Sequence, residues 1–309
     1  MSTVTTTTKN VDYVGLFKIA GLVSAALIIG TIAMFFTKGL NYGVDFRGGV
    51  ETQVKFSKDV KLGDLRELMK DKGVPLSQLQ SMGEESQNEF LLKLESDKGD
   101  LNAVSSQVSA VLNEKYGAGS FEILKNDIVG PKAGAELRTS AFKALAWAII
   151  AIMIYLALRF DYKFAPGAIA ALIHDVVIII GAFILTQKEF SLQIVAALLA
   201  IIGYSVNDTV VIYDRVREIE LANPGLSTIK VINRAINETM SRTIITSLTV
   251  LGVSLVMLFW GGSVIHDFFF AMTIGVILGV YSTIFIAVPM TVFTENMMNK
   301  NKSKSKIVA

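Results

Sequence analysis

The sequence predicts an α-helical integral membrane protein with six transmembrane helices and an α+β domain inserted between the first and second helices. Hydrophobic residues fill 52% of the 309 positions and charged residues 18%. Mean hydropathy is +0.52, higher than in ordinary soluble proteins. Six apolar runs approach the roughly 20 residues that a helix needs to cross a hydrocarbon core. They are residues 14–36, 141–158, 165–185, 190–213, 243–260 and 268–293.

These runs divide the chain into five parts. Residues 1–13 are polar and low in complexity, and we expect a disordered cytoplasmic N-terminus. The first span, 14–36, is followed by an α+β domain with an amphipathic connector at 37–140, which is long enough to fold as a unit. A five-helix bundle at 141–293 and a cytoplasmic Lys-rich tail at 294–309 complete the chain, and the end of the tail, "NKNKSKSKIVA", is expected to be disordered.

Basic residues orient the predicted spans. Lys and Arg gather in the loop 159–164, the connector 214–242 and the tail. The turns at the opposite ends of the spans, 186–189 and 261–267, contain a single Lys, Lys188, and no Arg. The positive-inside rule then places both termini in the cytoplasm and the 37–140 region on the far side, which is the periplasm in a bacterial inner membrane. The first span offers no small-residue cleavage site, so it is interpreted as a permanent anchor rather than a signal peptide.

Residues 37–140 alternate between strand-like and helix-like patterns. Strands are predicted at 50–56, 76–82 and 89–95, helices at 61–72 and 100–115, and a last strand in "SFEILKNDIV". The order βαββαβ is that of a ferredoxin-like domain, an antiparallel sheet backed by two helices. The region contains no His or Cys, and its carboxylates are interspersed with lysines. We therefore expect binding or mechanical transmission here, with neither catalysis nor a metal site.

A glycine-rich segment, "GVDFRGGV" at 43–50, precedes the first strand. Gly43, Gly48 and Gly49 allow backbone angles closed to other residues, and Asp45 and Arg47 can satisfy a tight connection. A structural turn is the favoured interpretation. A nucleotide-binding loop is disfavoured because no strand, helix and Lys-Ser or Lys-Thr ending surround it.

Ionisable residues inside the spans cost several kcal/mol, and each is a candidate functional site. The four places are His174 with Asp175, Asn207 with Asp208, Arg242, and His266 with Asp267. The last pair lies near water, where Asp267 suits a helix N-terminal cap. For the pair His174 and Asp175, a proton relay and a hydrogen bond across the bundle are equally open interpretations.

Asp208 and Arg242 form the strongest candidate site. They lie near the same ends of consecutive antiparallel spans and can therefore meet. Thr246 and Thr249 continue a polar stripe from Arg242, which should face protein or water. If helix movement makes and breaks the contact, the carboxylate would take up and release a proton, because burial and a nearby guanidinium affect its ionisation in opposite ways. A static ion pair that fixes packing is the alternative.

Small residues predict close helix packing in the last span. Gly275 and Gly279, together with Ala271 and Ser282, recur at helical spacing, which lets a neighbouring helix approach closely.

Several longer motifs resemble the SecD/SecF family of the resistance-nodulation-division superfamily. They are "GVDFRGG", "IVGPKAGAELRTSAFKA", "LRFDYKFAPGAIAALIHDVVIIIGAF", "IIGYSVNDTVVIYDRVRE" and "NETMSRTIITSLTVL", in the family's order and over essentially the whole chain.

The resemblance implies a function that spacing alone does not give. A chain of this kind pairs with SecD to form twelve helices, associates with the SecYEG channel, and promotes translocation of unfolded secretory proteins with the proton-motive force. It also makes YajC a candidate partner. The family's proton-conducting Asp and Arg fall on Asp208 and Arg242, next to Asn207. The implied protein is not an enzyme and uses no cofactor other than protons. A net charge of +2 gives no reason to expect nucleic acid.

Three alternatives stay open to different degrees. A small-molecule or lipid exporter of the same superfamily usually carries twelve helices and larger external domains. An intramembrane aspartyl protease needs a Gly-x-Gly-Asp segment in addition to Tyr213-Asp214, and the sequence has none. A non-conducting scaffold that stabilises the channel fits the same residues, because a proton site and an ion pair look alike in sequence.

Overall fold

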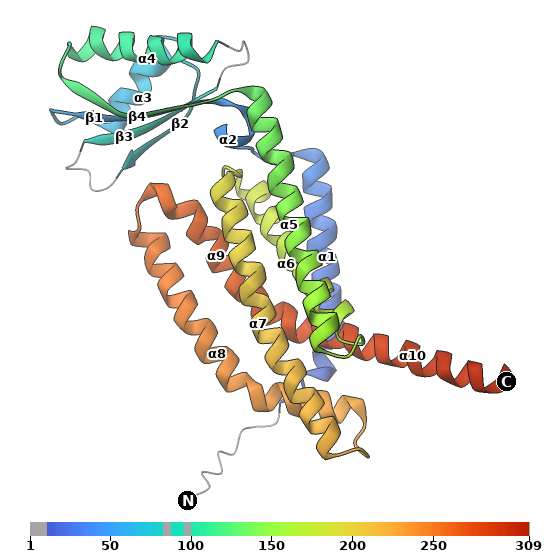
Figure 1. The fold of residues 1–309 in the computed structure, drawn as a ribbon. Coiled ribbons are helices and arrows are strands. Elements are labelled where there is room, and N and C mark those ends of the chain that lie inside the picture. The colour runs from blue at the N-terminus through green and yellow to red at the C-terminus, as the bar shows by residue number, and fades with distance from the viewer. Residues whose placement is uncertain (1–10, 83–87, 96–99, 309) are drawn as a thin grey trace, which may run out of the picture.

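The fold is known from a computed structural model that describes residues 11–82, 88–95 and 100–308. The first ten residues of the predicted disordered N-terminus therefore lie outside the described part. A bundle of long helices carries a small α+β domain at one end (Figure 1). The helix ends near the domain are called the domain side of the bundle, and the opposite ends the far side.

The α+β domain confirms the predicted element order. It consists of β1 (Gly49–Phe56), α3 (Leu62–Asp71), β2 (Leu76–Met82), β3 (Glu89–Leu94), α4 (Leu101–Tyr116) and β4 (Phe121–Val129). The strand order is β2-β3-β1-β4, and every neighbouring pair is antiparallel. Both helices lie on the sheet face away from the bundle (Figure 1). Their apolar faces bury a core against the alternate residues of the strands, including Leu65, Val108, Val50 and Leu92.

Six helical segments are long and apolar enough to cross a membrane, as predicted. They are α1 (Phe17–Thr37, extended by the short helix Val14–Leu16), α5 (Pro131–Arg159), α6 (Ala165–Thr186), α7 (Leu192–Ala222), α8 (Thr228–Trp260), and α9 (Ser263–Ser282) continued by α10 (Val288–Val308). The chain is therefore a multi-pass membrane protein, and the predicted fold class is confirmed.

The helices extend beyond the predicted apolar runs. α7 and α8 continue through most of the charged connector 214–242, with a turn only between Ala222 and Thr228. A helix started in an apolar span can continue into water because each added residue forms another backbone hydrogen bond. Arg215 of α7 pairs with Glu238 of α8, and Arg234 supports Glu238 from one turn earlier. These ion pairs hold the two helices together at the far side.

The C-terminal part corrects one expectation. The terminal segment "NKNKSKSKIVA" was predicted to be disordered, but α10 is helical to Val308. This helix projects away from the bundle (Figure 1). Between α9 and α10, residues Thr283–Ala287 form a π-helix. Hydrophobic periodicity does not reveal such a segment, because one extra residue per turn barely changes a uniformly apolar run.

The bundle has an inner and an outer set of helices. Half of the most apolar stretch is buried in α6, in α7 and in the last span, but only 17% in α1, α5 and α8. The inner helices therefore form the protein core of the bundle. The outer helices leave large apolar side chains exposed, such as Leu22, Leu158 and Leu248, as expected of surfaces that contact lipid or another membrane protein.

Candidate functional site

Asp208 lies inside the bundle, in the middle of α7. Its side chain is only 3% exposed. Ser247 of α8 directs its hydroxyl at the carboxylate from 3.5 Å, and Tyr204 donates to Ser247 at 3.0 Å. A contact of 3.5 Å is at the limit of a hydrogen bond. Asp208 is thus a buried acid whose one side-chain hydrogen-bond partner among the described residues lies at the limit of hydrogen-bonding distance. A charged carboxylate in such a position is costly.

Arg242 does not contact Asp208. Among the described residues, no ion pair within 4.0 Å involves Asp208, and Arg242 is exposed on α8. The expected meeting of the two side chains is therefore not formed in this structure. The hydroxyl of Thr246 donates to the backbone carbonyl oxygen of Arg242 at 3.0 Å, a hydrogen bond within α8.

Exposed polar residues lie on α7 and α8, the two helices that meet at Asp208. Asn207, Arg242 and Thr249 are exposed there, within helices long enough to cross the membrane. Polar side chains facing hydrocarbon are unfavourable. These residues are chemically suited to contact with protein or water.

A second polar site is more deeply buried. His174 and Asp175 of α6 are 2% and 1% exposed. Nδ1 of His174 lies 3.1 Å from Oδ1 of Asp175, and Oδ2 of Asp175 accepts hydrogen bonds from Ser205 of α7 at 2.9 Å and Ser282 of α9 at 2.7 Å. On the other side, Nε2 of His174 lies 3.2 Å from the hydroxyl of Ser24 in α1. Four helices meet at this cluster.

Most of this site is not apparent from the sequence. The ionisable residues His174 and Asp175 are candidates by their place in an apolar span, but nothing in the sequence points to Ser24 or Ser205. Each serine lies in a different apolar span, so no spacing in the sequence connects it with the acid. A small hydroxyl residue in a span is equally typical of close packing, which is how Ser282 was interpreted.

The small residues of α9 pack against α7 as expected. A Cβ atom on Gly275 would lie 2.4 Å from the side chain of Ile201, and one on Gly279 would lie 3.5 Å from Ser205. The close approach at these glycines brings α9 near enough to α7 for Ser205 and Ser282 to reach the same carboxylate oxygen.

The glycine-rich segment joins the domain to the bundle. Instead of a simple turn, residues Val44–Arg47 form a short helix, α2. Gly48 follows with a φ of +88°, a left-handed conformation that favours glycine. Asp45 accepts a hydrogen bond from the backbone N–H of Leu192 at 3.1 Å, the first residue of α7. Asp45 was expected to form hydrogen bonds within its own loop. It instead accepts from the first turn of α7, the helix that carries Asp208.

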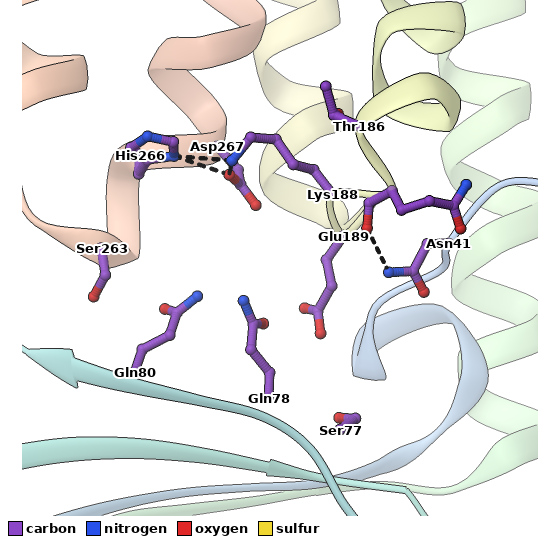
Figure 2. Close-up of a pocket in the computed structure, with 11 residues that line it drawn as sticks. Asn41, Ser77, Gln78, Gln80, Thr186, Lys188, Glu189, Ser263, His266 and Asp267 are labelled. Carbon is purple, nitrogen blue, oxygen red and sulfur yellow. Dashed lines mark hydrogen bonds and ion pairs between the residues drawn. The ribbon is translucent and has the colours of Figure 1, made fainter. Parts of the chain in front are cut away.

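A polar cavity of about 440 Å³ lies between β2 and the domain side of the bundle. Lys188 donates to Asp267 at 2.6 Å and lies 3.1 Å from Nδ1 of His266 (Figure 2). Asp267 was expected to cap a helix, but α9 already begins at Ser263, with Gly262 as its N-cap. Asp267 therefore holds Lys188 across the cavity instead.

A neighbouring hollow contains the partly buried Glu51 of β1. Burial raises the pKa of Glu51, and Lys93 of β3 partly offsets this effect. The amine of Lys93 lies 4.0 Å from Glu51 and 2.7 Å from Glu189, in the turn between α6 and α7. The open face of the sheet is thus tied to the bundle by charge.

Comparison with known proteins identifies the family. The family model described as "Protein export membrane protein SecD/SecF, C-terminal" matches residues 107–297, and the SecD/SecF GG motif matches residues 33–60. The GG motif therefore includes the segment that caps α7.

Relatives and a solved structure agree with these matches. A protein translocase subunit SecF of Calditerrivibrio nitroreducens is 42% identical over 282 residues, covering 90% of this chain and 92% of its own length. One of Helicobacter pylori is 38% identical, covering 86% and 81%. The crystal structure of SecDF, a translocon-associated membrane protein of Thermus thermophilus, has a TM-score of 0.77 and 34% identity. It covers 96% of this chain, which spans only 40% of SecDF. The resemblance is confirmed, and the chain belongs to the SecD/SecF family of protein-export membrane proteins.

Proposed function

We propose that this chain works with SecD in Sec-dependent protein export and uses the proton-motive force to promote movement of unfolded secretory proteins through SecYEG. One observation carries the proton-coupled part: Asp208 is 3% exposed within a helix long enough to cross the membrane, and it forms no ion pair among the described residues. A permanently charged carboxylate in that position would be very costly. An acid that is neutral at one stage and charged at another avoids that cost for part of the cycle.

Arg242 would act on the charged state. It is exposed on the helix that also carries Ser247, the hydroxyl partner of Asp208. When Asp208 loses its proton, a movement of α7 against α8 that brings the guanidinium close would stabilise the carboxylate. Reprotonation would remove this attraction and release the helices. Asn207 and Thr246 would line the proton route, where their polar groups can hydrogen-bond to water.

Helix α7 would transmit this movement to the domain. Its first residue is capped by Asp45, and the turn before it holds Lys93 of the sheet. A shift of α7 therefore changes two contacts of the α+β domain directly. In this proposal the domain lies in the periplasm, where it can act on the emerging client, and both termini lie in the cytoplasm, as the distribution of basic residues favours.

The exposed polar residues Asn207 and Arg242 support pairing with SecD. The SecDF structure that resembles this chain is more than twice its length, so a second membrane half is available to cover such a surface. Membership in an export family supports the further proposals of SecYEG as the channel, YajC as a further subunit and the inner membrane as the location. A non-conducting scaffold and a small-molecule or lipid exporter are the competing functions.

The decisive experiment uses vesicles that contain this chain with SecD and SecYEG. Asp208→Asn should abolish proton-driven completion of translocation while leaving the ATP-driven step largely intact, and Arg242→Leu should give a similar defect. Asp214→Asn, an exposed acid on the same helix, is the matched control and should behave as wild type. If Asp208→Asn vesicles respond to the proton gradient as well as wild type does, the protein is a scaffold. Gradient-dependent efflux of small molecules or lipid without an effect on secretory proteins would indicate an exporter.

A further inference from the structure

The hydrogen bonds around His174 can be assigned a direction from one end of the network. The hydroxyl of Tyr281 lies 2.7 Å from the carbonyl oxygen of Ala20. A carbonyl oxygen only accepts, so the single Tyr281 proton is used there. The hydroxyl of Ser24 lies 2.9 Å from the Tyr281 oxygen. The proton of that second bond must therefore come from Ser24.

This assignment determines the tautomer of His174. Because Ser24 has already donated its one proton to Tyr281, it can only accept from Nε2 of His174, 3.2 Å away. Nε2 thus carries a hydrogen. The imidazole ring also stacks on the Tyr281 ring, with centroids 5.8 Å apart, which holds the ring in this orientation.

The other ring nitrogen faces an acid. Nδ1 of His174 is 3.1 Å from Oδ1 of Asp175. If His174 were neutral and Asp175 ionised, two lone pairs would oppose each other in a site that is 1–2% exposed. A hydrogen bond requires one more proton, on Nδ1 or on Oδ1. In either case the pair has no net charge, which suits its burial in an apolar bundle.

Neighbouring groups offer no alternative compensation. Ser205 and Ser282 both donate to Oδ2 of Asp175, and α1 contributes Ser24. Tyr281 is the one further titratable side chain hydrogen-bonded to this network among the described residues. Within that part of the chain, no Lys or Arg lies within 4.0 Å of Asp175. Helix α7 also carries the buried Asp208, but its hydrogen-bond partner is Ser247 of α8 and not a member of this network.

We propose that His174 and Asp175 form a second proton-holding site, which carries one exchangeable proton between Nδ1 and Oδ1 and links α1 to the inner helices. This inference rests on the proposed proton-coupled function and extends it to residues outside the Asp208 site. In the loaded state the pair is neutral. When a proton leaves, the Nε2–H bond breaks and a water molecule accepts that proton to become hydronium. The shared proton then resides on Nδ1, His174 is neutral, Asp175 is ionised, and the pair keeps a charge of −1.

Helix α1 is the element whose movement would admit this water. Its most apolar stretch is only 17% buried. At the level of the site, Ser24 of α1 hydrogen-bonds to Tyr281 and to His174, and the Ala20 carbonyl oxygen of α1 accepts from Tyr281. Separation of α1 from α6 would therefore expose Nε2 of His174 first. Ser205 and Asp208 are three residues apart on α7, so a shift of that helix alters the contacts of both acids in one movement.

The first test measures the tautomer directly in the full chain, reconstituted in lipid bilayers. The sequence has only two histidines, so ¹⁵N-histidine labelling of a His266→Gln variant reports on His174 alone. Solid-state NMR should show a protonated Nε2 at neutral pH, and Asp175→Asn should change the Nδ1 signal. A bare Nε2 with a protonated Nδ1 would overturn the proposal, because the pair would then hold no extra proton.

The second test asks whether the proton must move. Asparagine at position 175 can donate to Nδ1 and accept from both serines, so Asp175→Asn imitates the loaded pair without an exchangeable proton. We expect unchanged thermal stability and SecD pairing, but a loss of about tenfold or more in proton-driven translocation. Asp214→Asn, an exposed acid outside this network, is the matched control and should retain the response. A wild-type response of Asp175→Asn would overturn the proposal.

The two proposals fail in different ways. If Asp208→Asn behaves as wild type, the proton-coupled function is wrong whatever the NMR spectrum of His174 shows. If Nε2 of His174 is bare while Asp208→Asn is inactive, the function stands and the second site is wrong.

Discussion

The amine of Lys93 in β3 lies 2.7 Å from the carboxylate of Glu189, in the turn between α6 and α7, and their side chains are only 16% and 13% exposed. This ion pair joins the sheet to the inner helices at the polar cavity. Buried charges of this kind are costly when one partner is removed, because the other is left without compensation. The contact is therefore suited to make the α+β domain follow the bundle.

Lys93→Met and Glu189→Gln should be strongly coupled in a double-mutant cycle. We expect an interaction energy of about 1–3 kcal/mol in thermal or denaturant unfolding, together with faster hydrogen exchange in β2 and β3. Lys55 and Glu89, paired at 2.7 Å within the domain but with Lys55 48% exposed, provide the matched control and should couple by less than about 1 kcal/mol. Additive effects of Lys93→Met and Glu189→Gln would show that the pair does not fix the domain.

Glu51 should make the stability of the domain depend on pH. Burial raises the pKa of its carboxyl group above the unfolded value, although Lys93 opposes this. The protonated form then stabilises the fold, and this contribution is lost as the pH rises through the folded pKa. Glu51→Gln should therefore raise the unfolding temperature at neutral pH and have little effect in acid. Thermal unfolding at both pH values measures the difference, and equal effects at the two would contradict the assigned shift.

Gly49→Ala should destabilise the junction between α2 and β1. The added Cβ would lie 2.3 Å from the carbonyl oxygen of Leu94, a backbone atom of the paired strand that cannot move alone. We expect a loss of at least about 2 kcal/mol, measured by thermal unfolding and by protease cleavage of the domain.

Gly63 provides the control for this substitution. It lies in α3, and a Cβ there would meet nothing within 4 Å. Gly63→Ala should be neutral or stabilising by roughly 0.5–1 kcal/mol, because alanine restricts the unfolded chain and favours helix. Equal losses for Gly49→Ala and Gly63→Ala would exclude close backbone approach as the cause.

The sequence was sufficient for features that depend on neighbouring residues. Apolar length alone predicts six spans, and alternation with periods of 2 and 3.6 residues predicts the βαββαβ order. The positions of Asp208 and Asp175 within apolar runs also identify them as candidate functional residues, because an ionisable group in a membrane span is costly. Helix ends were less predictable, because a helix continues into charged residues such as those around Arg215 once it has formed.

Only the tertiary structure decided which side chains meet. It placed Arg242 on the surface and gave Asp208 a serine partner, although position along adjacent spans suggested a direct pair. It also gathered Ser24, Ser205 and Ser282 from three helices around one acid on a fourth. Rotation and separation of packed helices set such contacts, and these depend on close packing at residues such as Gly275. A hydrogen bond changes with shifts of a few tenths of an ångström, whereas hydrophobic periodicity specifies only the face of a helix.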